Sequence, residues 1–285
     1  MELPRSLRRV GKTRAVLGEG IRYDAVSDTF SWLDIPSSRA WRLGSNGREV
    51  ELSLGKEAAF AFLTEDARTL AGGDSGFYLD GTSVGRGFFS NTEVLNDGAV
   101  HPSGQFTVFG SRDRREEKPH GHMWCMGRDL VEMPWQFTVF NGPAFSPEGA
   151  RIYFADSPAR TIFMAEVNAK RQKIGDRDIF AVVPEALGYP DGMICDDEGG
   201  LWSAHWDGGC ITRYHPNGTV DRRIRMPVSR PTSLAFKGTT LYATSARLDG
   251  PEDDGGADGC VFAFDAGHAG PPCPRLSTSI LTTIY

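Results

Sequence analysis

The chain has 285 residues, of which 40% are hydrophobic and 24% charged, and this balance excludes a disordered chain because it supplies enough apolar surface for a core. Its net charge of -6 comes from interspersed acidic and basic residues without a basic stripe, which argues against nucleic acid as a partner. Apolar runs fall short of the roughly 20 residues of a membrane span, so we expect no membrane partner. The five cysteines are scattered along the chain, which favours a reducing compartment, and we therefore expect a cytoplasmic protein.

Short strand-like segments, separated by glycine and proline, run through the whole chain. Six of them share one pattern, a turn followed by an apolar or aromatic run: DTFSWLDI near 28, ARTLAGGD near 67, GQFTVFGS near 104, ARIYFADS near 150, GLWSAHWD near 200 and TTLYATSA near 239. Their marker residues are Phe30, Leu70, Phe106, Ile152, Leu201 and Leu241, and successive markers lie 36 to 49 residues apart. This spacing is typical of one four-stranded blade of a β-propeller.

The repeat predicts an all-β protein, a single domain over residues 1–285 in which six blades of four antiparallel strands surround a central channel. A β-sandwich followed by a smaller domain is the alternative, but it gives no reason for the matched spacing. The segment TRAVL at 13–17 is short and β-branched enough to complete the last blade and close the ring. The tail RLSTSILTTIY, from about residue 275, is left open as a second closing strand or a disordered end.

An acid or an amide recurs at one place in this repeat. Equivalent places in a ring of blades converge on its axis, where buried carboxylates and amides are costly to desolvate unless a cation or polar ligand receives them. Hard oxygen donors favour calcium, magnesium or manganese, with zinc also possible. The residues are Glu19, eleven before Phe30; Asn96, ten before Phe106; Asn141, eleven before Ile152; and Asp191, ten before Leu201.

Other candidate motifs favour structural explanations. The segment GTSVG at 81–85 matches the G-x-S-x-G pattern, but polar turn residues surround it where a nucleophile elbow needs a strand before and a helix after. His205 lies beside a predicted strand without an H-x-x-x-H partner, so we expect a structural histidine. The acidic run DGPEDD at 249–254 lacks the ligand order of an EF-hand and is expected to be an exposed loop.

Five segments of the chain form a distinctive combination: LGEGIRYDAVSDTFSWLDI (17–35), NDGAVHPSGQFTVFGS (96–111), NGPAFSPEGARIYFADSPARTIF (141–163), GYPDGMICDDEGGLWSAHWDGGCITRYHPNG (188–218) and RPTSLAFKGTTLYATSAR (230–247). Together they resemble the senescence-marker-protein/gluconolactonase family of regucalcin-like six-bladed propellers. The resemblance implies one divalent metal ion held by Glu19, Asn141 and Asp191, with Asn96 contacting the substrate or completing the metal shell. It also implies hydrolysis of sugar-acid lactones, often aldonolactones, by metal-activated water with Asp191 as the catalytic base.

Departures from the family pattern concern the substrate side of the site. Family members commonly place an arginine two residues before the asparagine of NDG, and here that position is Val94. A further substrate-contacting glutamate of the family falls in RDRREEKPHGHMW, where Glu117 is the best candidate. An apolar residue at 94 removes one set of hydrogen bonds to substrate hydroxyls, so we expect a lactone that is less hydroxylated than gluconolactone or differently oriented. A non-catalytic metal- or ligand-binding propeller and a protein-interaction platform stay open as alternatives, as does the oligomeric state.

Overall fold

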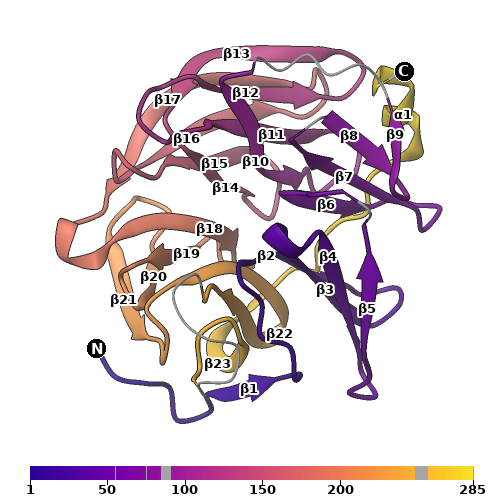
Figure 1. The fold of residues 1–285 in the computed structure, drawn as a ribbon. Coiled ribbons are helices and arrows are strands. Elements are labelled where there is room, and N and C mark those ends of the chain that lie inside the picture. The colour runs from indigo at the N-terminus through magenta and orange to yellow at the C-terminus, as the bar shows by residue number, and fades with distance from the viewer. Residues whose placement is uncertain (55, 75, 85–90, 248–255, 285) are drawn as a thin grey trace.

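The strands of the protein form six antiparallel sheets that stand as blades around a central axis (Figure 1). The computed structural model describes residues 1–54, 56–74, 76–84, 91–247 and 256–284. The predicted acidic loop at 249–254 therefore lies outside the described residues. The six-bladed propeller that the repeat predicts is confirmed.

Blades one to five each take four consecutive strands. Blade one is β2 (Gly18–Asp24), β3 (Thr29–Asp34), β4 (Arg39–Gly44) and β5 (Glu49–Ser53). Blade two is β6 (Phe60–Leu63), β7 (Thr69–Gly73), β8 (Gly76–Leu79) and β9 (Thr82–Val84). Blade three is β10 (Glu93–Val100), β11 (Thr107–Asp113), β12 (Gly121–Met126) and β13 (Leu130–Phe137). Blade four is β14 (Phe140–Phe145), β15 (Arg151–Asp156), β16 (Thr161–Asn168) and β17 (Lys173–Val182), and blade five is β18 (Tyr189–Cys195), β19 (Leu201–Trp206), β20 (Cys210–Tyr214) and β21 (Val220–Arg225).

The first strand of each of these blades lies nearest the axis (Figure 1). The second strand contains the marker residue in blades one, two, four and five, and in blade three Phe106 directly precedes it. The markers are buried, with Phe30 the most accessible of them at 6% exposure. Aromatic and aliphatic side chains of this kind fill the space between neighbouring blades, as where Phe60 and Phe109 of blades two and three pack with ring centroids 5.9 Å apart. The apolar residues that repeat in the sequence are therefore those that pack one blade against the next.

Blade six draws on both ends of the chain. The strand β22 (Pro231–Ser245) reverses at Gly238, whose φ of 59° is left-handed, and the hydroxyls of Thr232 and Thr244 on its two halves lie 2.9 Å apart. The strand β23 (Val261–Gly270) follows, and β1 (Arg8–Val10) pairs with it from the outside. The N-terminus thus closes the ring.

The predicted closing strand at 13–17 is wrong in its residues, although the N-terminal segment does complete the last blade. The strand that pairs with β23 is Arg8–Val10. Within 13–17, only Leu17 forms an isolated bridge, with Ala246. The physical reason is the distance between the outer edge of blade six and the axis of the ring. Once β1 has paired at the outer edge, residues 13–17 have to carry the chain back to the axis, where β2 begins.

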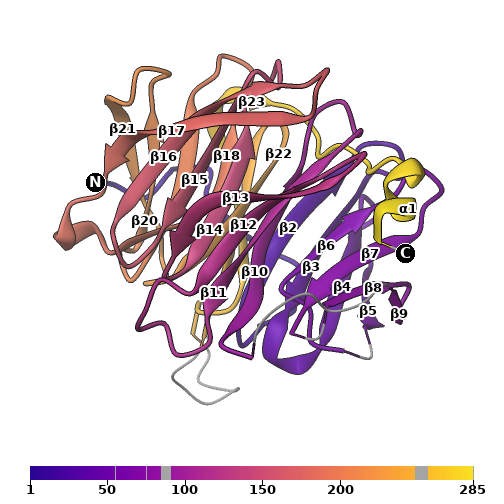
Figure 2. The same cartoon turned by 90° about the horizontal axis from the view of Figure 1, so that it is seen from above.

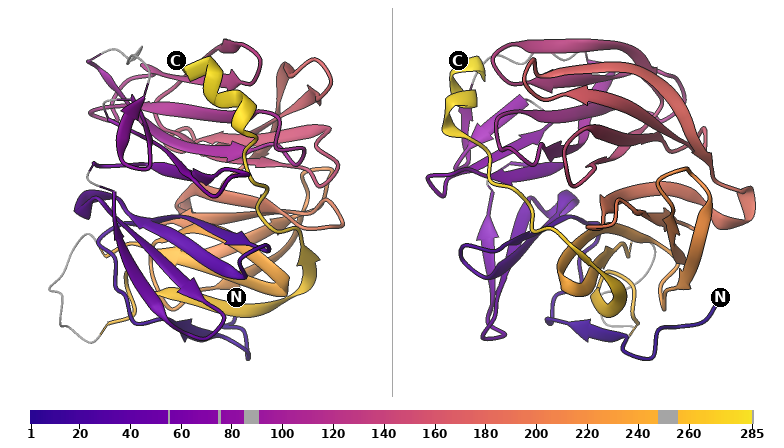
Figure 3. Two further views of the ribbon diagram at one scale, coloured as in Figure 1. Left: turned by 90° about the vertical axis from the view of Figure 1, so that its right-hand side faces the viewer. Right: turned by 180° about the vertical axis from the view of Figure 1, so that it is seen from behind.

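The C-terminal tail is an ordered strap, so neither alternative considered for it holds. After β23 the chain crosses one end of the ring and finishes against blade two (Figure 3). Leu276 forms a parallel bridge with Thr64, and two short helices follow, η3 (Thr278–Ile280) and α1 (Leu281–Ile284). Arg275 donates two hydrogen bonds to the carboxylate of Asp24, at 2.9 and 2.8 Å. From above, α1 and the N-terminus lie on opposite flanks of the molecule (Figure 2).

Two further short helices, η1 (Ile35–Ser37) and η2 (Glu185–Leu187), connect strands near the ends of blades one and four. No helix within the described ranges has both the length and the apolar character needed to cross a membrane.

Candidate functional site

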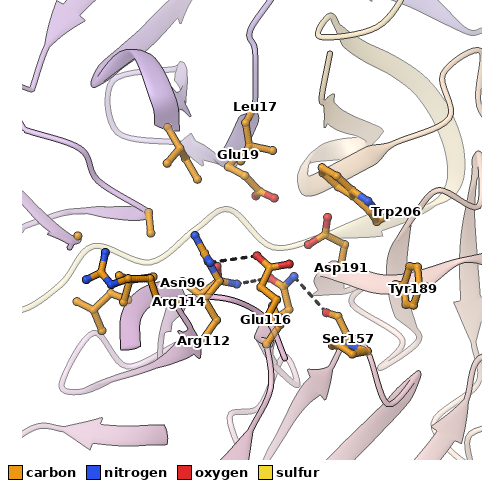
Figure 4. Close-up of a pocket in the computed structure, with 18 of the residues that line it drawn as sticks. Leu17, Glu19, Asn96, Arg112, Arg114, Glu116, Ser157, Tyr189, Asp191 and Trp206 are labelled. Atoms are coloured by element: carbon orange, nitrogen blue, oxygen red, sulfur yellow. Dashed lines mark hydrogen bonds and ion pairs between the residues drawn. The ribbon is translucent and has the colours of Figure 1, made fainter. Parts of the chain in front are cut away.

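A cavity of about 580 Å³ opens at one mouth of the central channel. The four residues selected from the repeat all line it, and each comes from the innermost strand of a different blade. Figure 4 shows the carboxylates of Glu19 and Asp191 pointing into the same space. The structure therefore brings together the set that the sequence predicts: Glu19 on β2, Asn96 on β10, Asn141 on β14 and Asp191 on β18.

A β-bulge interrupts each of the four innermost strands at its site residue. A bulge leaves residues unpaired and bends the strand, which turns a side chain out of the regular alternation between the two faces. Left-handed glycines accompany two of the bulges, Gly20 with φ 58° and Gly142 with φ 61°. The register shifts lie between Glu19 and Arg22, Leu95 and Asp97, Asn141 and Ala144, and Pro190 and Met193.

A chain of hydrogen bonds fixes the two amides of the site across three blades. Asn96 donates through Nδ2 to the carbonyl of Phe140 at 2.8 Å and to Oδ1 of Asn141 at 3.4 Å. Asn141 in turn donates through Nδ2 to Oγ of Ser157 at 3.3 Å, and this hydroxyl donates to the carbonyl of Pro190 at 2.7 Å. The orientation of the Asn141 amide is set by these partners on both sides.

The two carboxylates of the site lie in a strongly unfavourable place for negative charge. Burial, followed by repulsion from Asp191 and Asp97, raises the pKa of Glu19 well above its ordinary value. Burial, followed by repulsion from Asp97, does the same to the pKa of Asp191. Asp191 is 3% exposed, and in the described part of the chain its Oδ1 has no hydrogen-bond partner. A buried carboxylate oxygen without a partner is costly, which marks this atom as one that receives a ligand.

Asp97, which sequence reasoning passed over, is the third acid at the axis. Its Oδ1 accepts the N–H of Gly98 at 2.7 Å and its Oδ2 accepts the N–H of Gly142 at 2.8 Å. Burial raises the pKa of Asp97 to about 6, against the lowering effect of these hydrogen bonds and of Arg22. Asp97 lines a second cavity, of about 370 Å³, toward the end of the channel that the strap crosses. Its carboxylate links the bulge of β10 to that of β14.

The donor set of the first cavity fits a hard divalent cation. Nowhere in the described ranges do three His, Cys, Asp or Glu side chains gather as a ligand set, so a cation between Glu19 and Asp191 needs the amide oxygen of Asn141 as its third protein donor. Two carboxylates and an amide oxygen are donors that calcium, magnesium and manganese accept. A positive charge there would also offset the repulsion that raises the two pKa values.

The rim of the cavity contains residues that the sequence did not single out. Val94 lines the cavity as expected, and Arg112 lies directly opposite it on β11 and lines the cavity too. Glu117 does not line the cavity; it is exposed, and its N–H donates to Oδ2 of Asp113 at 2.9 Å. The geometry favours the preceding residue over Glu117 as a substrate contact, because Glu116 lines the cavity and forms an ion pair with Arg112. Other lining residues that sequence reasoning missed include Tyr189, Trp206, Glu57, Asp74 and Arg114.

Ser83 and His205, from two of the motifs set aside in the sequence, are not among the residues that line the cavity. Ser83 is exposed on β9, the outermost strand of blade two. His205 is buried on β19, its Nδ1 lies 3.0 Å from the carbonyl oxygen of Leu187, and burial lowers its pKa to about 4. Both findings agree with the structural roles expected for them.

Comparison with known proteins identifies relatives over nearly the whole chain. Residues 17–247 match the family described as the SMP-30/Gluconolactonase/LRE-like region. An L-arabinolactonase of Azospirillum brasilense is 33% identical over 93% of both chains, and a pentonolactonase of Haloferax volcanii is 30% identical over 94% of this chain and 97% of its own. Among solved structures, a calcium-binding regucalcin of Agrobacterium tumefaciens superposes with a TM-score of 0.86 at 25% identity, covering 96% of this chain and 98% of that one.

Proposed function

The chain belongs to the SMP-30/gluconolactonase/LRE-like family, and on that premise we propose that it is a lactonase that hydrolyses a sugar lactone in the cavity around Glu19 and Asp191. The observation that carries the proposal is the buried Oδ1 of Asp191, which has no hydrogen-bond partner within the described residues although it lines a cavity with other oxygen donors. A small-molecule lactone is the partner that the family relatives support. A cytoplasmic location stays an expectation from the cysteine pattern.

We further propose that Glu19, Asn141 and Asp191 hold one divalent metal ion, with calcium, magnesium, manganese and zinc as candidates. When bound, such an ion would polarise the lactone carbonyl and make a bound water more acidic. The hydrogen bonds from Asn96 and to Ser157 hold the Asn141 side chain at the cavity, with Oδ1 toward Asn96 and Nδ2 toward Ser157.

Asp191 would act as the general base. A lactone is a cyclic ester, so its hydrolysis forms a bond from water oxygen to the carbonyl carbon and breaks the bond from that carbon to the ring oxygen. Oδ1 of Asp191 would accept the proton of the attacking water and later return it to the leaving alkoxide, so that the products are the open hydroxy acid and an unchanged enzyme.

The remaining walls of the cavity would hold the sugar ring. Leu17, Val94 and Val139 present apolar surface, and Tyr189 and Trp206 present aromatic rings. Apolar and aromatic walls with a few polar groups are typical of sites that enclose a small ligand and exclude bulk water. Asn96, anchored by Phe140 and Asn141, would contact a substrate hydroxyl.

The test is a panel of aldonolactones, including pentonolactones and gluconolactone, followed by proton release at neutral pH and corrected for spontaneous opening. We expect opening that stops on chelation and returns with at least one of calcium, magnesium, manganese and zinc. Opening that survives complete metal removal would contradict the role of the metal. Metal binding without the opening of any lactone would leave a non-catalytic binding propeller, the alternative that the sequence left open.

A further inference from the structure

A guanidinium reaches the part of the cavity where Val94 lies, but from the neighbouring strand. Val94 on β10 and Arg112 on β11 are direct cross-strand partners, and both line the cavity. Directly opposed residues of an antiparallel pair project from the same face of the sheet with their Cβ atoms about 5 Å apart. The small side chain of Val94, which is 7% exposed, leaves the space above it to the longer one. Arg112 itself is partly open to the cavity, with 28% of its side chain exposed.

The loop after β11 places a carboxylate against this guanidinium. Nη1 of Arg112 lies 3.0 Å from Oε1 of Glu116 (Figure 4). Glu116 adopts a left-handed φ of 58°, which costs a residue with a side chain of order 1 kcal/mol and persists only where the surroundings enforce it. Asp113 enforces it, because its Oδ2 accepts the N–H of Glu117 at 2.9 Å and its Oδ1 lies 2.8 Å from Nδ1 of His120. The backbone that carries Glu116 is therefore held beside Arg112 before any ligand arrives.

The charges around the cavity restrict what this pair can bind. Arg112 and Arg114 are the basic residues in the described lining, and each forms an ion pair, with Glu116 and Asp74 respectively. Because both arginines are already paired with carboxylates, neither offers an uncompensated positive charge to an anionic group on a substrate. A fixed pair of N–H donors and a carboxylate acceptor instead matches neighbouring hydroxyl groups, each of which both donates and accepts. The acidic lining residues are Glu19, Glu57, Asp74, Glu116 and Asp191.

We propose that Arg112, held by Glu116, is the substrate-binding residue that sets specificity in this cavity, and that it binds the hydroxyl groups of an uncharged, polyhydroxylated lactone. Arg112 thereby supplies from β11 the donors that residue 94 lacks on β10. The inference deepens the proposed lactonase function and rests on it.

The experiment moves the guanidinium between the two strands. Arg112→Val should lower kcat/KM for a fully hydroxylated aldonolactone about 10- to 100-fold, the range for losing hydrogen bonds to a charged group, mainly through KM. A deoxy-lactone that lacks the contacted hydroxyl should lose little. The double variant Val94→Arg/Arg112→Val should recover part of the loss. The matched control is Arg39→Val, which breaks the exposed pair of Arg39 with Glu51 on β4 and β5 and should leave the kinetics unchanged.

The possible outcomes separate the two proposals. If the wild-type protein opens lactones but Arg112→Val changes the hydroxylated and deoxy substrates equally, the role of Arg112 is wrong while the function stands. Preference for a carboxylated or sulfonated lactone over the uncharged one overturns the assignment of an uncharged substrate. If the wild-type protein opens no lactone, the proposed function itself fails. Should Arg112→Val not fold, Arg112→Lys and Arg112→Gln provide the same comparison, because both keep a long side chain but lose the planar fork.

Discussion

Asp191 has one carboxylate oxygen without a hydrogen-bond partner in the described structure. Replacing Asp191 can therefore distinguish a catalytic base from a residue that only binds the metal. An amide keeps a coordinating oxygen but accepts no proton from water. We therefore expect Asp191→Asn to lower kcat about 10²- to 10⁴-fold, the usual loss on removing a general base, while a metal titration by calorimetry still shows one bound ion.

Asp197→Asn is a suitable control for that variant, because Asp197 is exposed and follows the same strand. It should keep the wild-type rate. Near-normal turnover in Asp191→Asn would show that Asp191 only binds the metal, and that another group takes the proton.

Asp97 gives the metal-free protein a pH dependence of predictable sign. Its pKa is about 6 in the folded protein and near 3.8 when unfolded, so between these values the folded state binds more protons and stability falls as pH rises. The loss is complete above pH 6 and amounts to about 3 kcal/mol, because one pKa unit corresponds to about 1.36 kcal/mol. The raised pKa values of Glu19 and Asp191 act in the same direction.

Urea unfolding of the chelated protein between pH 4 and 7, compared with Asp97→Asn, measures this effect. The variant cannot titrate at residue 97, so the difference in unfolding free energy between the two proteins should change by about 3 kcal/mol over the range. Parallel curves would mean that Asp97 does not titrate in this window. A bound divalent ion should weaken the pH dependence of the wild-type protein.

The residues of the site were predictable to the extent that they repeat. The same position in four blades is occupied by Glu19, Asn96, Asn141 and Asp191. Equivalent positions of blades that surround one axis lie close together, and these four residues line one cavity. Asp97 has no equivalent in that register. Identifying Arg112 as a cavity residue requires knowing which residue of β11 lies opposite Val94. That register cannot be derived from the sequence, because β10 contains a bulge. The expectation of a less hydroxylated substrate, drawn from Val94 alone, did not take Arg112 into account.

At the scale of the element, the bulges of the innermost strands are what turn the site residues toward the axis. Gly142 in the bulge of β14 is the most constrained of them, because a Cβ there would come within 2.3 Å of the backbone oxygen of Asp191 and because its φ is 61°. Gly142→Ala should therefore destabilise the protein by about 1–3 kcal/mol and weaken metal binding, since both Asn141 and Asp191 would shift.

Gly238 offers a matched control for this substitution. Its φ of 59° imposes nearly the same backbone strain, but a Cβ there meets nothing within 4 Å. Gly238→Ala should lower the melting temperature modestly and leave metal affinity unchanged. Equal effects of the two variants on metal affinity would show that the bulge of β14 does not position the ligands.

The strands themselves were largely predictable, whereas their ends and irregularities were not. Turn residues and apolar runs recur in every blade, and they locate the second strand of each. The bulges look like ordinary turns in the sequence, because Asn-Gly and Asp-Gly serve both. The choice of 13–17 over Arg8–Val10 as the closing strand followed β-propensity, but position along the blade decided the pairing.

At the scale of the whole molecule, the strap joins blade one to blade two across one end of the channel. Arg275 reaches both carboxylate oxygens of the half-buried Asp24, and its hydrogen bonds are the main reason that the pKa of Asp24 is lowered. We expect Arg275→Met to lower the free energy of unfolding by about 1.5–3 kcal/mol, the range for hydrogen bonds to a charged group. Urea unfolding at neutral pH measures it.

Arg68→Met removes a comparable ion pair, that of Arg68 with Asp66, which is exposed and local in sequence. Exposed pairs contribute about 0–1 kcal/mol, so this control should be nearly neutral. If the two variants lose the same stability, the strap contributes no more than a surface contact.

Closure of the ring by β1 also means that this strand stays unpaired during most of the synthesis of the propeller. Arg8–Val10 leaves the ribosome about 250 residues before its partner residues in β23, Val261–Ala263. Throughout that interval the nascent chain carries an unpaired strand that five growing blades could capture wrongly. The strand is three residues long and begins with two arginines, and short, charged strands are poor templates for misplaced pairing. A segment with stronger β-propensity would close the finished ring more tightly, but it would expose every nascent chain to premature pairing along the way.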